Sequence, residues 1–320
     1  MSGQKIKWGV LGYARIAKGS VMPAIERSKN STLYAVASRD RQRLNECREK
    51  FGCPKVYDNY EELLNDPDVQ AVYIPLPNGL HREWAVKAAR KGKHVLCEKP
   101  VSINTRQCME MIGECKKNGV KLMEAFMYRY TTRTRKILEL IESNAIGQIR
   151  HIYSSFSFVL DRTVDCRWEP SQGGGALMDV GCYPVNFIGM LIGDVPVSMG
   201  AECVMKNGVD LRFSAVLKYE NGVIADISCG FDGFINQLSQ ITGTEGTILI
   251  PDTFSDCEGK IILKTNDFSK EIEVEPCDRY VLEVEDFADS ILEGREPSLS
   301  MDESLRNISI IEKLLDMAYR

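Results

Sequence analysis

Short apolar runs alternate with amphipathic stretches over the first 124 residues of the chain. The runs lack a strict polar–apolar alternation, which is typical of strands that helices cover on both faces. Strands that alternate with helices in this way predict a parallel sheet with right-handed crossovers, and so a doubly wound Rossmann domain over residues 1–124. We expect strands in KIKWGVLG, STLYAVAS, KVYD, VQAVYIP, KHVLCEK and VKLMEA, and helices near 16–28, 41–51, 60–65, 80–92 and 105–118.

The pattern changes after residue 124. A helix near 131–143 precedes the run QIRHIYSSFSFVL, and a glycine-rich break at 172–175 leads into an apolar helix that ends near 192. Turn signals join several of the strand-like runs that follow. They predict a second, α+β domain over 125–320, built on a largely antiparallel open sheet and closed by helices near 281–293 and 302–318. The expected strands are PVSMGAECVM, DLRFSAVLKY, GVIADISCG, QLSQITG, GTILIP, KIILKT and SKEIEVE.

Composition and charge narrow the classes of partner. The formal net charge is −5 and the isoelectric point is near 5.5. Nucleic acids and anionic membranes need clustered Lys and Arg, so neither is expected as a partner. The first residues lack the apolar core of a signal peptide, and no uncharged apolar run reaches the roughly 18 residues that a membrane span needs. Eleven cysteines without a C-x-x-C pair indicate reduced thiols in the cytoplasm, and three dispersed histidines argue against a metal site.

The first strand ends in GVLGYARIA (9–17) and leads into a helix. A dinucleotide fingerprint places glycines where the chain turns tightly, approaches the pyrophosphate and packs helix on strand. Gly12, Ala14 and Ala17 stand at those positions, so the motif alone also suits an ordinary strand-to-helix turn. Its place at the first strand of a βαβ series favours dinucleotide binding. The backbone N–H groups expected to face the pyrophosphate are those of Ala14, Arg15 and Ile16.

The end of the second strand indicates which dinucleotide is bound. NAD enzymes place an acid there to bind the ribose hydroxyls, and such a carboxylate repels a 2′-phosphate. This strand ends without an acid before Asp40, which suits a helix N-cap. Ser38, Arg39 and Arg43 offer donors for a phosphate, so NADP(H) is favoured over NAD(H). The alternative is that these arginines are only a solvated helix start.

Two further segments carry groups for proton chemistry. Lys99 follows the fifth strand, at the sheet edge where ligands of doubly wound folds bind, and it precedes Pro100 in a bond that admits the cis form. Asp179 and Tyr183 are four residues apart and share a face of a helix. Pro184 requires a kink there, or the end of one helical piece at Tyr183. The alternative reading is a buried tyrosine with a capping aspartate.

These segments together resemble one family. The chain carries G-V-L-G-x-A-x-I-A, Y-I-P-L-P-N-x-x-H (73–81), G-K-H-V-L-C-E-K-P (92–100), E-A-F-M-Y-R (124–129), G-G-G-A-L-M-D-V-G-C-Y (173–183) and G-T-E-G-T (243–247). The set resembles the glucose–fructose oxidoreductase/inositol dehydrogenase/MocA (Gfo/Idh/MocA) family, in order and over nearly the whole chain. It is most similar to the branch of dimeric dihydrodiol dehydrogenases, NADP-dependent xylose dehydrogenases and glucose–fructose oxidoreductase, which carries Tyr where inositol dehydrogenases carry His.

The resemblance implies roles for particular residues. Lys99 would orient the substrate and lower the pKa of the acid/base, and Tyr183 would be that acid/base. Asp179 would be a third catalytic residue, which positions the substrate or acts as an electrostatic partner. Ala14 departs from the family's second glycine, which shifts the expected approach of the pyrophosphate by no more than a methyl group. The other implied contacts with the cofactor are Leu76, Asn78 and His81 at its nicotinamide half, Glu98 at its ribose, Lys99, and Arg129 at the pocket wall. Arg167 would lie at the substrate mouth.

These expectations favour one function over two others. The favoured function is an NADP(H)-dependent oxidoreductase that moves a hydride between nicotinamide and a CH–OH/C=O group of a sugar or cyclic polyol. The first alternative is a non-catalytic NADP-binding regulatory protein of the same fold. The second is an enzyme that interconverts two sugars with a tightly held cofactor. The presence of Lys99, Asp179 and Tyr183 together favours an enzyme.

The second domain also predicts a homodimer. The run GVIADISCGFDGFINQLSQITG places apolar residues on both faces of a strand, with Val223, Ala225 and Ile227 on one face and Ile224 on the other. Apolar surface of that extent usually marks an interface, and two-fold pairing is the commonest way to cover it. The resemblance implies the same. The alternative is that these residues pack under the helices at 281–318 within one subunit.

Overall fold

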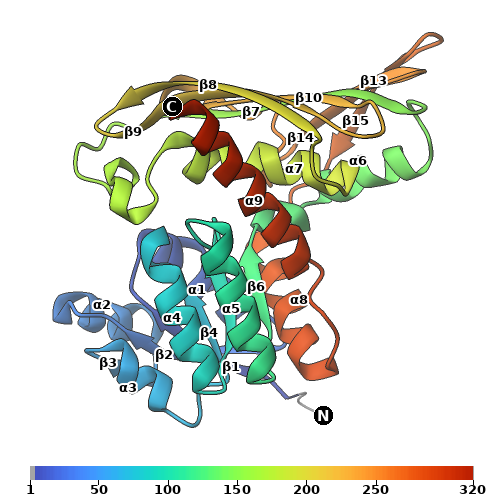
Figure 1. Cartoon of the computed structure of the whole chain (residues 1–320). Helices are drawn as coiled ribbons and strands as arrows, with labels where there is room; N and C mark the ends of the chain where they lie inside the picture. Colours follow the sequence, from blue (N-terminus) through green and yellow to red (C-terminus); the bar gives the residue numbers. More distant parts are fainter. Residues whose placement is uncertain (1–3, 320) are drawn as a thin grey trace. The chain divides into compact units, whose positions relative to one another are not determined.

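The computed structural model describes residues 4–319, which form two compact units. The first contains the chain up to Met127 and the segment Tyr280–Met301, and the second contains Tyr128–Arg279 and the residues from Asp302 onward. The sequence places the boundary at 124 and assigns everything after it to the second domain. The structure differs because the chain returns to the first unit near its end. Figure 1 labels most of the helices and strands of both units.

The first unit contains a six-stranded sheet in which every neighbouring pair is parallel. The strand order is β3-β2-β1-β4-β5-β6, so the order reverses between β1 and β4. Ligands of such sheets bind outside the carboxyl ends of the strands at this reversal. The predicted doubly wound domain is confirmed. Its strands are β1 (Ile6–Leu11), β2 (Ser31–Ala37), β3 (Lys55–Tyr57), β4 (Ala71–Ile74), β5 (His94–Glu98) and β6 (Leu122–Ala125).

Helices cover both faces of this sheet, as neighbouring residues of β1 show. Trp8 points to one face, where its ring lies 5.7 Å from that of Phe287 in α8. Gly9 points to the other, where a Cβ would come within 2.7 Å of Leu63 in α3. Both faces are therefore apolar and closely packed, which explains the lack of alternation in the sequence. The helices are α1 (Met22–Arg27), α2 (Arg41–Phe51), α3 (Tyr60–Asn65), α4 (Asn78–Arg90), α5 (Thr105–Lys117) and α8 (Arg279–Glu293).

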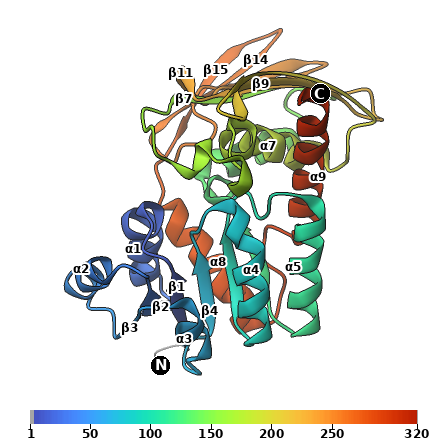
Figure 2. The ribbon, with the colours of Figure 1, turned by 60° about the vertical axis from the view of Figure 1, so that its left-hand side comes forward.

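Helix α8 corrects the predicted domain organisation. The sequence assigns it to the closing helices of the second domain, but its apolar face packs on the parallel sheet of the first unit (Figure 2). Asn30 also binds it, because its side-chain amide donates to the carbonyl oxygen of Glu285 at 2.9 Å and to Asp289 at 2.6 Å. An amphipathic pattern predicts a helix with one apolar face, but it does not say which sheet that face covers.

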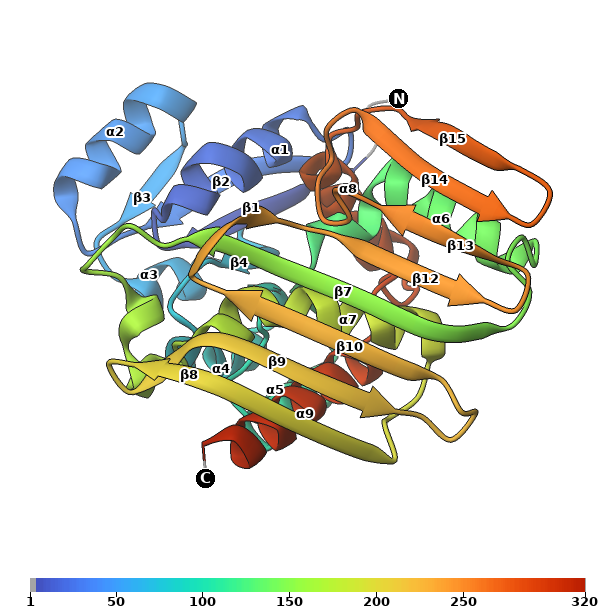
Figure 3. The same ribbon diagram turned by 90° about the horizontal axis from the view of Figure 1, so that it is seen from above.

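The second unit contains a nine-stranded sheet of mixed direction, seen in Figure 3. Its strand order is β15-β14-β13-β12-β7-β10-β9-β8, with β11 paired to β7 beside this path. Only the pair β7–β10 is parallel among the described pairs of this sheet, so the predicted, largely antiparallel sheet is confirmed. The sequence missed β11. The strands are β7 (Ile149–Val159), β8 (Ser198–Lys206), β9 (Val209–Lys218), β10 (Ile224–Gly230), β11 (Asp232–Asn236), β12 (Ser239–Gly243), β13 (Gly246–Ile250), β14 (Gly259–Thr265) and β15 (Ser269–Val274).

One face of this sheet packs on helices α6 (Thr132–Glu142), α7 (Cys182–Ile192) and α9 (Met301–Ala318) (Figure 3). The other face carries no helix of the described residues. The stretch Pro170–Ile192 is long and apolar enough to cross a membrane by composition, but 83% of its apolar window is buried inside the structure. Burial of this extent is what the core helix of a folded domain shows.

A π-helical turn precedes a proline at two places in the chain. The turn η1 (Ala17–Val21) lies before Pro23, and η5 (Leu177–Gly181) lies before Pro184. Proline has no N–H for the carbonyl four residues earlier, and its ring clashes with that carbonyl. A wider turn ahead of the proline relieves the clash. The kink expected at Pro184 is therefore a wide turn, and the helix continues through Tyr183 to Ile192.

Candidate active site

The turn after β1 has the shape that a bound pyrophosphate needs. Gly12 has a φ of +111°, a region that L-residues rarely adopt, and a Cβ there would come within 3.1 Å of Leu76 Cδ2. A helix begins at Arg15, directly after the turn, so the N–H groups of its first turn have no earlier helical carbonyl to bind. A glycine turn that leads into a helix N-terminus fits the phosphates of a dinucleotide.

The end of β2 offers cationic donors and no competing acid. Asp40 caps α2, because its carboxylate accepts from the N–H groups of Gln42 at 2.9 Å and Arg43 at 3.3 Å, as the sequence predicts. Arg39 is exposed, and the Arg43 guanidinium pairs with Asp40 at 3.4 Å. Ser38 is buried, and its hydroxyl oxygen accepts from the N–H of Asp40 at 3.2 Å. The carboxylate of Asp40, the acid nearest this strand end, is thus already hydrogen-bonded to the N-terminus of α2.

The sequence did not predict a role for Tyr60, which lies beside this turn. Its hydroxyl oxygen is 3.5 Å from the position that a Cβ on Gly12 would take. Tyr60 follows β3, and Leu76, which borders the same space, follows β4. An aromatic residue directly after a short edge strand was the available signal. It is a weak one, because most such residues only pack.

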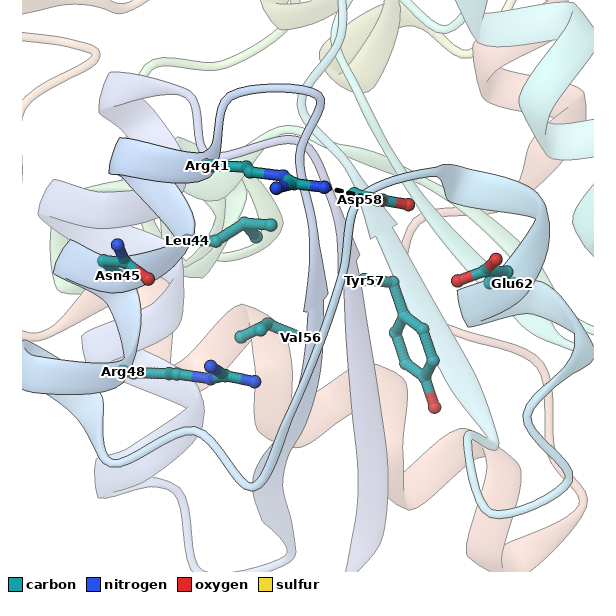
Figure 4. A pocket seen from close by; sticks show the side chains of 8 residues that line it. All are labelled: Arg41, Leu44, Asn45, Arg48, Val56, Tyr57, Asp58 and Glu62. Carbon is teal, nitrogen blue, oxygen red and sulfur yellow. Dashed lines mark ion pairs between the residues drawn. The ribbon is translucent and has the colours of Figure 1, made fainter.

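A hollow of about 370 Å³ lies behind α2 and contains none of the predicted site residues. In Figure 4 Arg41 reaches across its rim toward Asp58, at 3.9 Å, and Tyr57 points away from them. Most of its lining is exposed, and its charged groups are of both signs, so nothing in it selects a ligand. Its residues are Arg41, Leu44, Asn45, Arg48, Val56, Tyr57, Asp58 and Glu62.

Side chains from neighbouring strands fix the backbone around Lys99. The Tyr73 hydroxyl donates to Glu98 Oε1 at 2.5 Å, and Glu98 Oε2 accepts from the N–H of Lys99 at 3.2 Å. Burial and the adjacent Glu98 carboxylate raise the pKa of Tyr73 well above its ordinary value, so the phenol stays a donor. Glu124 of β6 accepts from the N–H of Val101 at 2.8 Å. The Lys99–Pro100 bond between these contacts is cis.

His81 is buried between two loops of the first unit. The resemblance implies a contact with the nicotinamide half of the cofactor, but the side chain has no exposed surface. Its two ring nitrogens lie 3.0 Å from the carbonyl oxygen of Pro100 and 2.7 Å from that of Leu76. Burial lowers the pKa of the imidazole. His81 therefore joins the two loops that carry Leu76 and Pro100, and its predicted contact with the cofactor stays a prediction.

In the second unit, Tyr183 lies in an aromatic cluster. Its ring centroid is 5.8 Å from that of Tyr128, 5.2 Å from Phe156 and 5.3 Å from Phe254. The predicted alternative of a buried tyrosine thus describes the ring correctly, with 4% of the residue exposed. Asp179 does not act as a cap. It accepts from Arg167 Nε at 2.5 Å, and Arg167 also donates to Asp165 at 3.2 Å.

Asp210 holds the start of the helix that carries Asp179 and Tyr183. Its carboxylate accepts from the N–H of Leu177 at 2.6 Å and from the Tyr319 hydroxyl at 2.8 Å. Burial raises the pKa of Asp210, while these hydrogen bonds oppose the rise. A Cβ on Gly175 would clash with the Asp210 carboxylate, which explains a glycine at this position. Tyr319, the last described residue of the chain, thereby helps to fix the start of the helix at Leu177.

Two further predicted residues, Arg129 and Asn78, lie in different units. Arg129 belongs to the second unit, where its guanidinium binds Glu303 at 3.1 Å and Asn186 at 3.4 Å. Its predicted contact with the cofactor stays a prediction, and these two partners already hold it in place. Asn78 is the first residue of α4, after the loop that carries Leu76. No group of three His, Cys, Asp or Glu side chains within residues 4–319 could hold a metal ion.

Two family models match most of this architecture. The model of an oxidoreductase family with an NAD-binding Rossmann fold matches residues 6–126, and that of the GFO/IDH/MocA C-terminal domain matches residues 134–249. The chain belongs to the GFO/IDH/MocA family. The fold, the family and a nicotinamide-dependent oxidoreductase, all predicted from the sequence, are thereby confirmed.

Known proteins resemble the chain over three quarters of its length or more. A D-xylose 1-dehydrogenase (NADP(+)) from Haloferax volcanii is 35% identical, with 97% of each chain covered. A trans-1,2-dihydrobenzene-1,2-diol dehydrogenase from Xenopus laevis is 34% identical over 77% of this chain and 75% of its own. Among solved structures, a 3-ketoreductase from Actinomadura kijaniata in complex with NADP and TDP-benzene is 29% identical, with a TM-score of 0.92 and 98% of each chain covered. An aldose–aldose oxidoreductase from Caulobacter crescentus, complexed with glycerol, is 26% identical, with a TM-score of 0.93 and coverage of 99% of this chain and 98% of its own.

Proposed function

We propose that this protein is an NADP(H)-dependent dehydrogenase or reductase that acts on a CH–OH/C=O group of a sugar or cyclic polyol. The observation that carries the proposal is the helix start held by Asp210, because the continuous helix that follows it carries both Asp179 and Tyr183. Arg167, from the preceding turn η3 (Cys166–Trp168), binds Asp179 and fixes its carboxylate. A phenol and a carboxylate on one rigid helix suit the binding and deprotonation of a hydroxyl group. Xylose, dihydrodiol and aldose names among the relatives support the same class of substrate.

The choice of NADP(H) rests on the end of β2. Asp40 is bound to the N–H groups of α2, so it is held away from the role that an acid plays in NAD enzymes. The exposed Arg39 guanidinium has the planar donors that a phosphate accepts. The D-xylose dehydrogenase and the 3-ketoreductase among the relatives are both named with NADP, which supports this choice.

The proposed chemistry divides the work between cofactor and protein. The nicotinamide, when bound, accepts or supplies the hydride. Tyr183 exchanges the hydroxyl proton with the substrate, and Lys99 binds and orients the substrate oxygen. A free tyrosine titrates near 10, so a neighbouring positive charge is needed to make it an effective base at neutral pH. Asp179, held by Arg167, binds a second hydroxyl group and sets the orientation of the ring. Arg167 stands beside it at the substrate end.

A coupled screen tests the proposal. D-xylose, D-glucose, myo-inositol and trans-1,2-dihydrobenzene-1,2-diol are each offered with NADP and with NAD, and reduction is followed by absorbance near 340 nm. We expect turnover of at least one of them with a clear preference for NADP. Binding of NADP without turnover of any sugar, polyol or diol in either direction would instead support the non-catalytic alternative.

The second candidate function is the interconversion of two sugars with a tightly held cofactor. The resemblance to the aldose–aldose oxidoreductase favours it. Such an enzyme oxidises one sugar and reduces another without releasing the cofactor. The purified protein would then absorb at 260 nm beyond its own aromatic content, and near 340 nm once reduced by a sugar. A protein that leaves purification free of nucleotide and needs added NADP excludes this candidate.

We further propose a homodimer in the cytoplasm, paired through the open face of the second unit's sheet. The predicted dimer rested on four apolar residues of one run. Three of them, Val223, Ala225 and Ile227, are buried within the chain, while Ile224 is 42% exposed and could lie in an interface. Phe234 and Ile235, in β11, are 86% and 59% exposed. All eleven cysteines lie in the described part of the chain and none forms a disulfide there, which suits a reducing compartment.

The solution mass decides the oligomeric state. We expect about twice the chain mass of 36.0 kDa by light scattering coupled to gel filtration, because exposed apolar residues on the open face favour pairing. Replacing Ile224 with Lys should shift the mass toward the monomer, while Lys218→Ala on the same face should not. A wild-type mass near that of one chain at all concentrations would contradict the dimer.

A further inference from the structure

Tyr60 brings a hydroxyl group to the turn that follows β1. The hydroxyl oxygen lies 3.5 Å from the position of a Cβ on Gly12, and Leu76 Cδ2 borders the same point at 3.1 Å. Gly12 follows β1, Tyr60 begins α3 after β3, and Leu76 follows β4. Three loops at the carboxyl edge of the parallel sheet therefore meet at one point, and this is the edge where doubly wound sheets bind their ligands.

The ring of Tyr60 is held in place before any ligand arrives. It packs edge-on against Trp84 of α4, with ring centroids 4.8 Å apart and an angle of 90° between the rings. The residue before it, Asn59, caps α3 by accepting from the N–H of Glu62 at 2.8 Å. A phenol fixed in this way loses little conformational freedom when its hydroxyl binds a ligand.

The hydroxyl also lies beside the cationic groups at the end of β2. Burial raises the pKa of Tyr60, and Arg39, followed by Arg43, opposes that rise. Both guanidinium groups are thus near enough to favour a negative charge on the phenol oxygen. The surroundings that favour a negative charge there also favour a bound anion, to which the neutral phenol can donate.

We propose that Tyr60 is a further cofactor-binding residue, whose hydroxyl donates a hydrogen bond to the 2′-phosphate of NADP(H) beside Arg39. The inference rests on the proposed function. It adds one specificity-determining group, from the loop after β3, to the arginines that follow β2. A hydroxyl group forms a stronger hydrogen bond with a charged phosphate oxygen than with a neutral ribose hydroxyl. Tyr60 therefore contributes to the preference for NADP over NAD.

Two adenosine phosphates test the contact without any substrate. We would titrate 2′,5′-ADP and 5′-AMP calorimetrically into the wild type, Tyr60→Phe and Tyr57→Phe. Phenylalanine keeps the ring contact with Trp84 and removes only the hydroxyl group. Tyr60→Phe should therefore weaken the binding of 2′,5′-ADP by roughly tenfold and that of 5′-AMP by no more than about twofold. Tyr57→Phe is the matched control, because the Tyr57 hydroxyl already donates to Asp66 at 2.7 Å, and the side chain points away from Arg41 and Asp58 (Figure 4). It should leave both affinities unchanged.

Each outcome bears on the inference. Unchanged affinity for 2′,5′-ADP in Tyr60→Phe overturns it, and so does equal weakening of both nucleotides, which would place the contact on the part that they share. A wild type that binds both equally, or neither, would show that the proposed NADP preference itself fails. In that case the failure appears before any variant is measured, so the two proposals are tested separately.

Discussion

Replacing Tyr183 with Phe should lower kcat by about 100-fold or more, the usual scale for loss of a proton-transferring group. The substitution removes one hydroxyl and keeps the ring, so the packing against Phe156 and Phe254 persists and the fold should hold. Dissociation of NADP should change by no more than a few-fold, because Tyr183 belongs to the second unit and the nucleotide turn to the first. Steady-state kinetics with the best substrate of the screen and a nucleotide titration measure both quantities.

Tyr219→Phe is the matched control for this variant. The Tyr219 hydroxyl is buried in the same unit without a hydrogen-bond partner among residues 4–319, so its removal should not lower kcat. Near-normal turnover in Tyr183→Phe would assign proton transfer to another group. His81 is fully buried and its ring nitrogens lie beside two backbone carbonyl oxygens, so we do not expect it to take over this role.

Lys99→Met extends the same test to the first unit and should also cost about 100-fold in kcat. Methionine keeps an unbranched side chain of similar length without the charge, so a loss would reflect the ammonium group. Lys91→Met, at an exposed position of the same unit, controls for the loss of one positive charge. Equal effects of the two substitutions would contradict a catalytic role for Lys99.

Most of the fold was predictable because its signals are local. Runs of apolar residues without alternation identify the six parallel strands, and strand-like runs joined by turn signals identify most strands of the open sheet. The partner of α8 was not predictable, since the same amphipathic pattern suits either sheet, and only the packing of Phe287 on Trp8 decides it. Strand β11 was missed because DGFIN, which only Phe231 separates from β10, has no alternation to distinguish it from a loop.

The candidate site was predictable where a motif sets a backbone position. The glycine turn at Gly12, the N-cap at Asp40 and the helix with Tyr183 are all confirmed as structural features. Partners that come from distant parts of the sequence were not predictable. Asp210 holds Leu177 across 33 positions, and Tyr60 meets Gly12 across the sheet edge, so neither pair leaves a local pattern.

Replacing Arg39 with Ala should raise the KM for NADP by roughly 10- to 100-fold, as expected when charge-assisted hydrogen bonds to a phosphate are lost. The KM for NAD should change little, because NAD has no 2′-phosphate for the guanidinium to bind. The variant should fold normally, since the side chain is exposed and α2 keeps its cap at Asp40. The expected result is therefore a loss of preference between the cofactors, and not a loss of both.

Arg41→Ala separates this effect from a general loss of positive charge. Arg41 lies two residues further along the same segment, but it is directed to Asp58 at 3.9 Å on the rim of the hollow behind α2 (Figure 4). It should leave both KM values nearly unchanged, since a solvent-exposed charge is screened within about 10 Å at ordinary salt. Equal increases in the two KM values for Arg39→Ala, or a wild type that prefers NAD, would sink the assignment of NADP and leave the family and its oxidoreductase chemistry intact.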